Sequence, residues 1–483
     1  MLNLKDPSLL ETRAYICGHW VKTCDTFEVH NPASGNLIAN VTDVSVDDVS
    51  LAIDAAFEAQ KAWARQTSKE RAAILKRWHE LIVENVDDLA RILTAEMGKP
   101  LSEARGEVLY GASFIEWFAE EAKRVYGDVI PGHQRDKRLM VLKQPVGVVG
   151  SITPWNFPVA MIARKVAPAL AVGCSFVARP SEFTPLSALA LAVLGERAGL
   201  PKAVFSVVPS LDAPAIGKEL CHNSKVAKLT FTGSTKVGKI LLGQCAQTVK
   251  RVSLELGGNA PFIVFNDADI DAAVDGAVAA KFRNAGQTCV CANRIYVQSK
   301  AYEEFCEKFA TKVEALGVGD GLLEGISIGP LINDAATNKV REHIEDAIKL
   351  GARVLTGGKS HELGGNFFEP TVLVEVPAEA RVSKEETFGP LAPIIRFEDE
   401  REVVELSNDT DFGLAAYFYS SDTHRVWRLI EDLETGMVGV NTGLISTEVS
   451  PFGGVKQSGL GREGSKYGID EYLEIKSVCL GVI

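Results

Sequence analysis

Two cysteines one residue apart are the most chemically suggestive feature of the sequence. Cys289 and Cys291 lie in FRNAGQTCVCANR (282–294), with Arg283 and Arg294 on either side. A thiolate is a strong nucleophile, and nearby guanidinium groups favour the ionised thiol. Cysteine is more often a small packing residue, and C-x-C does not match the C-x₂₋₄-C spacing of zinc sites. The glycine and glutamine before Cys289 predict a loop that exposes its thiol.

Two other side chains could assist such a nucleophile. Glu255 ends the apolar stretch in VSLELGG (252–258), where burial could raise its pKa and make it a general base. Asn156 lies in PWNFP (154–158), where a proline on each side restricts the backbone and could aim the amide at a developing oxyanion. Taken alone, each motif fits a structural role better.

A glycine-containing stretch, GSTKVGKI (233–240), nearly matches the phosphate loop of nucleoside triphosphatases. Its last position is Ile240, so the hydroxyl that would hold Mg²⁺ is missing and triphosphatase activity is excluded. The stretch still runs from a predicted strand into a predicted helix, whose first N–H groups could bind an anion. A plain strand-to-helix turn is the commoner explanation.

The elements that must position these residues alternate regularly. Residues 46–122 have the spacing of long amphipathic helices, and strands then alternate with helices from 146 to 258. This alternation predicts a parallel sheet with helices on its faces, and such sheets bind ligands at the carboxyl ends of their strands. The pattern restarts at FIVF (262–265), so a second α/β unit is expected, as 483 residues also require.

Composition excludes several classes of partner. The 51 Lys and Arg residues against 63 Asp and Glu give a net charge of −12, so no nucleic acid is expected to bind. No apolar run has the length of a membrane span or a signal peptide. Nine scattered cysteines indicate reduced thiols and a cytoplasmic location. A mitochondrial matrix location stays open for a chain that has lost a transit peptide.

Seven motifs together carry a resemblance that none carries alone: PWNFP, RPSEFTP, FTGSTKVG, ELGG, FRNAGQTC, EETFGP and PFGGVKQSG. In this order and spacing they resemble the aldehyde dehydrogenase superfamily across essentially the whole chain. FRNAGQTCVCANR together with GLGREGSKYGIDEYLEIK resembles the succinate-semialdehyde dehydrogenase branch, or its close relative that acts on glutarate semialdehyde.

The resemblance implies an α/β fold of three parts. A Rossmann-type parallel-sheet domain for NAD(P) would comprise residues 1–124 and 144–257, and a second α/β catalytic domain residues 258–458. A small β element, residues 125–143 and 459–483, would join subunits into a homo-oligomer, a dimer or a tetramer.

The resemblance also implies a mechanism. Cys289 would attack the aldehyde to give a thiohemiacetal, whose oxyanion Asn156 and the Cys289 N–H would hold. Hydride would pass to the nicotinamide, and Glu255 would activate water to hydrolyse the resulting thioester. The competing class, a cofactor-independent thiol esterase or hydrolase, would need a histidine base, and no histidine lies in these motifs.

The implied cofactor is NAD, with NADP possible, and no metal is expected. Arg179 departs from the family pattern, which has lysine there; it could attract a 2′-phosphate, whereas Glu182 would repel one and accept from the ribose hydroxyl. The other residues expected along the cofactor are Trp155, Ser181, Gly233, Ser234, Leu256, Glu386 and Phe388.

The implied substrate is a small semialdehyde with a carboxylate opposite the reacting carbon. Arg164, Arg283 and Ser446 would bind that carboxylate, although arginines at these positions could equally be structural ion-pair partners.

The second thiol has two possible roles. Cys291 would resolve an oxidised Cys289 as a redox switch, or would be a small packing residue.

Overall fold

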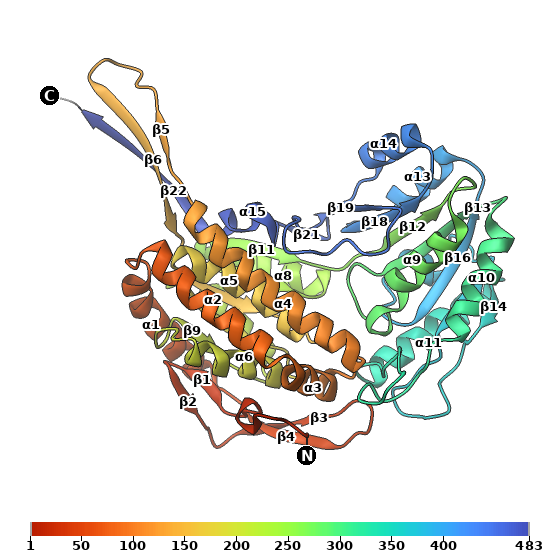
Figure 1. Ribbon diagram of the computed structural model, residues 1–483, viewed down its shortest axis with the longest axis horizontal. Coiled ribbons are helices and arrows are strands. Elements are labelled where there is room, and N and C mark those ends of the chain that lie inside the picture. Colours follow the sequence, from red (N-terminus) through yellow and green to blue (C-terminus); the bar gives the residue numbers. More distant parts are fainter. Residues whose placement is uncertain (1, 482–483) are drawn as a thin grey trace.

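Four short strands and four helices form the first part of the computed structural model, which describes residues 2–481 (Figure 1). The strands are β1 (Ala14–Ile16), β2 (His19–Val21), β3 (Thr26–His30) and β4 (Leu37–Thr42). The helices are α1 (Val46–Trp63), α2 (Ser68–Glu84), α3 (Val86–Met97) and α4 (Leu101–Glu121). Capping boxes at Ser45 and Thr67 start α1 and α2. The predicted helices are confirmed, except that the second is divided at Asn85.

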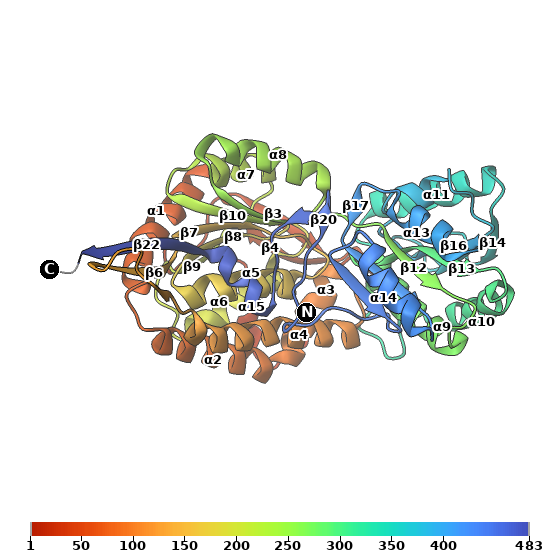
Figure 2. The same cartoon turned by 90° about the horizontal axis from the view of Figure 1, so that it is seen from above.

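An eight-stranded sheet follows, in the order β2-β1-β9-β8-β7-β10-β11-β21. Its parallel centre comprises β7 (Val148–Ile152), β8 (Ser175–Arg179), β9 (Phe205–Val207), β10 (Val226–Thr232) and β11 (Arg251–Glu255). The connecting helices are α5 (Pro158–Val172), α6 (Pro185–Arg197), α7 (Ala213–His222) and α8 (Thr235–Cys245). Helices cover both faces of this sheet, and an apolar core lies on each side (Figure 2). One layer contains α2, α4, α5 and α6, and the other contains α1, α7 and α8.

A second, seven-stranded sheet has the order β14-β15-β16-β13-β12-β18-β19. Its strands are β12 (Ala260–Val264), β13 (Ala292–Gln298), β14 (Arg353–Thr356), β15 (Thr371–Val374), β16 (Leu391–Phe397), β18 (Ala415–Tyr419) and β19 (Met437–Val440). All neighbours are parallel except β14 and β15. Its helices are α9 (Ile270–Phe282), α10 (Tyr302–Glu314), α11 (Asp334–Lys349), α12 (Arg381–Lys384), α13 (Glu400–Asn408) and α14 (Thr423–Asp432). The predicted α/β class is confirmed for both sheets.

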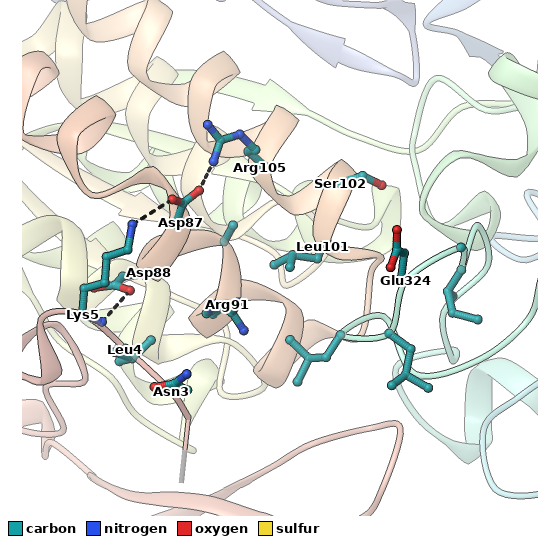
Figure 3. A pocket seen from close by; sticks show the side chains of 15 residues that line it. Asn3, Leu4, Lys5, Asp87, Asp88, Arg91, Leu101, Ser102, Arg105 and Glu324 are labelled. Atoms are coloured by element: carbon teal, nitrogen blue, oxygen red, sulfur yellow. Dashed lines mark hydrogen bonds and ion pairs between the residues drawn. The ribbon is translucent and has the colours of Figure 1, made fainter.

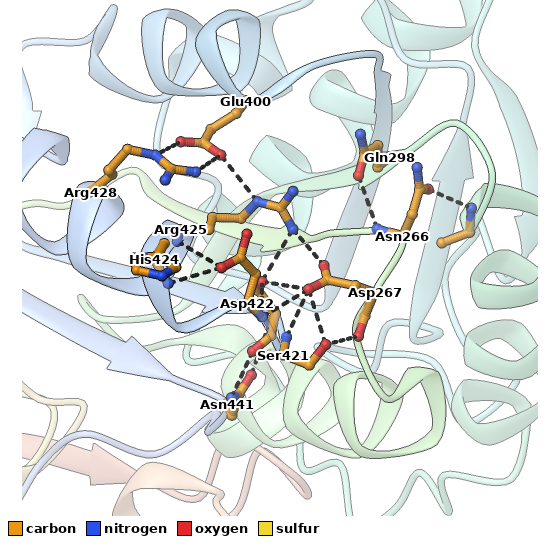
Figure 4. Close-up of polar contacts among 12 residues, drawn as sticks. Asn266, Asp267, Gln298, Glu400, Ser421, Asp422, His424, Arg425, Arg428 and Asn441 are labelled. Carbon is orange, nitrogen blue, oxygen red and sulfur yellow. Dashed lines mark hydrogen bonds and ion pairs between the residues drawn. The ribbon is translucent and has the colours of Figure 1, made fainter.

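A carboxylate at the end of β12 anchors α14 to this second sheet (Figure 4). Asp267 accepts the backbone N–H groups of Ser421 (3.0 Å) and Asp422 (2.9 Å), just before the helix begins. Arg425 on α14 pairs with Asp267 at 2.6 Å and with Glu400 on α13 at 3.1 Å. These contacts are structural, because they satisfy one another within the cluster.

A three-stranded antiparallel sheet projects from the body of the molecule (Figure 1). It contains β5 (Asp128–Ile130), β6 (Lys137–Pro145) and β22 (Leu473–Gly481), with β6 in the centre. The remaining short elements are β17 (Phe412–Gly413), β20 (Val455–Lys456), β21 (Gly459–Leu460) and α15 (Ser465–Gly468). β21 pairs with β11 in the antiparallel direction, so the chain returns to the edge of the first sheet before it reaches β22. The domain boundaries given above stay a prediction.

None of the helices in residues 2–481 combines the length and the apolar character that crossing a bilayer requires.

Candidate active site

Two cavities meet at Cys289, in the loop before β13. The first, of about 300 Å³, is lined by Glu103, Tyr110, Phe157, Arg164, Arg283, Thr288, Ser446 and Phe452, among others. The second, of about 280 Å³, is lined by Trp155, Asn156, Gly233, Ser234, Leu256, Glu386 and Phe388, among others. Cys289 and Met161 line both. The thiol therefore faces two separate compartments at once.

A third cavity extends the second along the carboxyl ends of the strands. It has about 340 Å³, shares Pro154, Thr232 and Gly233 with its neighbour, and includes Arg179, Ser181 and Glu182. The structure thus brings all predicted cofactor residues into one continuous groove. Gly233 follows β10, and Ser234 caps the N-terminus of α8, where free N–H groups favour an anion.

The groove fits a dinucleotide. At Gly257 a side chain would meet the Glu386 carboxylate at 3.2 Å, so glycine keeps this wall open. Burial raises the pKa of Glu386 to about 7. The rings of Trp155 and Phe388 meet edge to face at 5.7 Å at the end of the groove near Cys289.

Burial controls the protonation of Cys289. It raises the pKa of the thiol to about 12, although the guanidinium groups of Arg164 and Arg283 act in the opposite direction. The arginines favour the thiolate, as expected from the sequence, but the opposing effect of desolvation on the thiol pKa is larger. The thiol is therefore neutral as it stands and needs a base to become a nucleophile.

Glu255 is the last residue of β11 and only 2% exposed. Burial, and then the charge of Glu463, raise its pKa well above the usual range. Its Oε2 has no hydrogen-bond partner among residues 2–481. Glu463 in turn pairs with Arg164 and Lys165, two cations that sequence reasoning did not connect with it. The only sequence signal for Glu463 was its place in the glycine-rich GREG stretch.

The Asn156 side chain joins the loop after β7 to the loop that carries Cys289. Its Nδ2 donates to the carbonyl of Gln287 at 2.9 Å. A side-chain amide has two N–H groups, and Asn156 makes no other side-chain donation to residues 2–481.

The loop that carries Cys289 has a strained backbone. Asn284 and Ala285 both have φ of +53°, a strained conformation for residues with side chains.

Two arginines, Arg164 and Arg283, line the first cavity together with two glutamates, Glu103 and Glu107. Arg164 is buried over the ring of Phe452, with its guanidinium carbon 4.3 Å from the ring centroid. Its Nη2 lacks a hydrogen-bond partner in the described part of the chain. Arg283 lies 5.5 Å from the centroid of Phe157, and Ser446 completes the predicted set. Sequence reasoning missed Phe157, although it belongs to PWNFP.

Cys291 faces away from both cavities. It is buried, and its Sγ donates to the carbonyl of Lys281 at 3.4 Å. Both Cys289 and Cys291 are free thiols. The redox interpretation stays a prediction.

A larger cavity, of about 730 Å³, lies elsewhere (Figure 3). Lys5 and Arg105 both pair with Asp87 within it. It shares no lining residue with the cavities around Cys289, so it takes no part in the site.

Comparison with known proteins identifies the family. The model of the aldehyde dehydrogenase family matches residues 20–478. The chain belongs to the aldehyde dehydrogenase family. The resemblance inferred from the seven motifs is confirmed, and the protein is an oxidoreductase that oxidises aldehydes with NAD(P).

Several relatives match over the full chain. Glutarate-semialdehyde dehydrogenase of Pseudomonas aeruginosa and succinate-semialdehyde dehydrogenase [NADP(+)] of Escherichia coli are each 60% identical, covering 100% of both chains. 3-Sulfolactaldehyde dehydrogenase of Pseudomonas putida is 62% identical over 100% of this chain and 99% of its own. A crystal structure of an aldehyde dehydrogenase from Brucella melitensis superposes with a TM-score of 0.99, at 60% identity and full coverage of both chains.

Proposed function

We propose that the protein oxidises succinate semialdehyde to succinate through a covalent intermediate on Cys289. The observation that carries the proposal is the position of this thiol, between an arginine-containing cavity and a groove for a dinucleotide. The net reaction takes one aldehyde, one NAD(P)⁺ and one water to a carboxylate, NAD(P)H and two protons. NAD is the preferred cofactor and NADP an alternative.

In this mechanism Glu255 accepts the proton of Cys289, and the sulfur attacks the aldehyde carbon. The free N–H of the Asn156 amide and the N–H of Cys289 donate to the oxygen, which gains negative charge. Trp155, Glu386 and Phe388 would hold NAD(P)⁺ in the groove, where its nicotinamide would supply a hydride acceptor for this carbon. After Glu255 has lost the Cys289 proton to solvent, it deprotonates a water, and the resulting hydroxide attacks the thioester carbon. The sulfur leaves as a thiolate and takes the proton of the new carboxylic acid, which restores the thiol.

The anionic end of the substrate would bind at the opposite end of the first cavity. Arg164 has an unpaired N–H within the described residues, and Arg283 and Ser446 line the same cavity. The three relatives support an anionic tail, because their named aldehydes end in a carboxylate or a sulfonate. Glutarate semialdehyde, one methylene longer, is therefore the second candidate.

The test is the formation of NADH or NADPH with a panel of aldehydes: succinate semialdehyde, glutarate semialdehyde, 3-sulfolactaldehyde and uncharged propanal. We expect the highest kcat/KM for succinate semialdehyde and no turnover by Cys289→Ala. Arg283→Ala should raise KM for succinate semialdehyde roughly 10- to 100-fold, since a hydrogen bond to a charged group contributes about 1.5–3 kcal/mol.

For propanal the same substitution should change KM little. Arg401→Ala, on an exposed part of α13, is the matched control and should behave like the parent. An equal rise in KM for both aldehydes would remove Arg283 from the substrate site.

We also propose a homo-oligomer, a dimer or a tetramer, and a cytoplasmic location. Supporting the first is the projecting sheet of β5, β6 and β22; supporting the second is the free state of all nine cysteines.

A further inference from the structure

A buried lysine that lines neither cavity reaches the loop of Asn156. Lys99 follows α3 and is 1% exposed. Its Nζ donates to the carbonyl of Asn156 at 2.8 Å and pairs with Glu107 on α4 at 2.5 Å. The ammonium also lies 3.7 Å from the ring centroid of Phe157. A buried cation is costly unless it is paired and hydrogen-bonded, and these contacts meet both requirements for Lys99.

Glu107 extends this contact to the helix that follows the loop. Its second oxygen, Oε1, accepts the N–H of Val159 at 3.0 Å and the N–H of Ala160 at 3.3 Å. These groups belong to the first turn of α5, where backbone N–H groups have no partner within the helix. Lys99 and Glu107 together therefore fix the segment on both sides of Phe157.

One turn earlier on α4, a second carboxylate holds the other catalytic loop. Glu103 accepts the backbone N–H of Asn284 at 2.8 Å. The Asn284 side chain donates to the carbonyls of Asn156 (3.1 Å) and Gln287 (3.2 Å). Residues four apart lie on one face of a helix, so α4 holds both loops against each other. The strained φ angles of Asn284 and Ala285 persist within this network.

We propose that Lys99 is a positioning residue for the oxyanion site. The carbonyl of Asn156 accepts from both Lys99 and Asn284, so neither lone pair is free and the peptide cannot rotate without breaking a bond. The amide of the same residue uses one N–H on Gln287. With the peptide and one N–H fixed, the second N–H has a single direction. Asn156 and Cys289 line the same cavity, so this N–H would be held ready for the oxygen of an aldehyde on Cys289.

The inference rests on the role proposed for Asn156, and a double-mutant cycle separates the two. Lys99→Met combined with Glu107→Gln removes both charges together, because either change alone would leave a buried charge unpaired. The glutamine oxygen can still accept from α5. The measured quantities are the rate of the NADH burst with succinate semialdehyde, the Kd for NAD and the melting temperature.

We expect the burst rate to fall about 10- to 100-fold, as for a small misplacement of a catalytic group, with little change in the Kd for NAD. In an Asn156→Ala background the same pair of substitutions should cause no further loss, because the group that Lys99 orients is already gone. A purely structural role would give losses that multiply. Unchanged burst rates in the parent background, or multiplied losses, would overturn the proposal.

Two controls make the result specific. Arg71→Met removes another buried cation, which donates to the Ala171 carbonyl at the far end of α5, and it should lower stability while leaving the burst rate near that of the parent. Lys99→Arg preserves the buried charge and serves if the double variant does not fold. The Lys99→Arg protein should fold and still show a slower burst. A burst rate equal to that of the parent would contradict a positioning role for Lys99. If Asn156→Ala itself leaves the burst unchanged, the proposed mechanism fails instead.

Discussion

Glu255 and Glu463 are two buried carboxyl groups whose pKa values are shifted in opposite directions. Burial raises the pKa of both, but Arg164 and Lys165 outweigh it at Glu463 and bring that pKa below its usual range. The pKa of Glu255 remains high, partly because Glu463 is ionised. Environments that separate two carboxyl pKa values in this way are typical of acid–base sites.

A pH dependence follows from the raised pKa of Glu255. Glu255 therefore keeps its proton to higher pH than an ordinary glutamate, and its carboxylate, the form that can accept a proton, increases as pH rises. Thioester hydrolysis should therefore accelerate with pH, as measured by steady-state kcat from pH 6 to 9.5. Glu463→Gln should move this rise to lower pH, because a negative neighbour is lost while two cations remain. A hydrolysis rate independent of pH would exclude Glu255 as the base.

The second thiol supports a separate prediction about oxidation. Cys291 donates to the carbonyl of Lys281 and lines neither cavity that contains Cys289, so a disulfide between them requires the Cys291 thiol to leave this contact. We predict that mild peroxide inactivates the enzyme, that dithiothreitol restores it, and that Cys291→Ala loses this recovery. Mass spectrometry should find one peptide across residues 284–294 lighter by two hydrogens. Cys479→Ala, which removes an exposed thiol, should recover like the parent; full recovery of Cys291→Ala would leave it a packing residue.

At the scale of elements, the sequence predicted the strands and helices, because local residue patterns determine them. Buried parallel strands are nearly continuous apolar runs, so β7, β8, β10 and β11 could be located, and with them the residues at their carboxyl ends. This is why Asn156, Gly233 and Glu255 could be placed at one edge. Lys99 could not, because its partner Asn156 lies 57 residues away and no periodicity connects a lysine after one helix to a loop after a strand.

At the end of β8, Arg179 and Glu182 favour different cofactors, NADP and NAD respectively. Arg179 donates to Glu182 at 2.9 Å and to the Ser210 carbonyl at 2.7 Å, so the two residues with opposite cofactor preferences bind each other. Glu182→Ala should remove the repulsion of a 2′-phosphate and release one arginine N–H to bind it. The ratio of kcat/KM for NAD to that for NADP should fall about tenfold, as expected for one hydrogen bond to a charged group.

Glu405→Ala, on the exposed side of α13, provides the control and should leave the ratio unchanged. If Glu182→Ala also leaves it unchanged, neither residue binds near the ribose.

At the scale of the whole molecule, the projecting sheet is the feature that a single chain does not explain. Its central strand β6 pairs with β22 from Leu473 to Gly481, although the two strands lie more than 300 residues apart in sequence. Its edge strands expose apolar side chains, with Val129 on β5 83% exposed and Ile475 on β22 70% exposed. Exposed apolar side chains gathered on one small sheet indicate a site where another chain can bind.

The last prediction tests whether a second copy of the chain covers this sheet. Replacing Val129 and Ile475 together by lysine places two charges where a partner would bury apolar surface, so the oligomer should dissociate into smaller species. Sedimentation velocity at micromolar concentration measures this, and Leu51→Lys, at an exposed leucine on α1, should leave the oligomer intact. The catalytic cavities contain no residue of the projecting sheet, so burst kinetics in the dissociated form should persist. A sedimentation coefficient equal to that of the parent would show that the projecting sheet does not join the subunits.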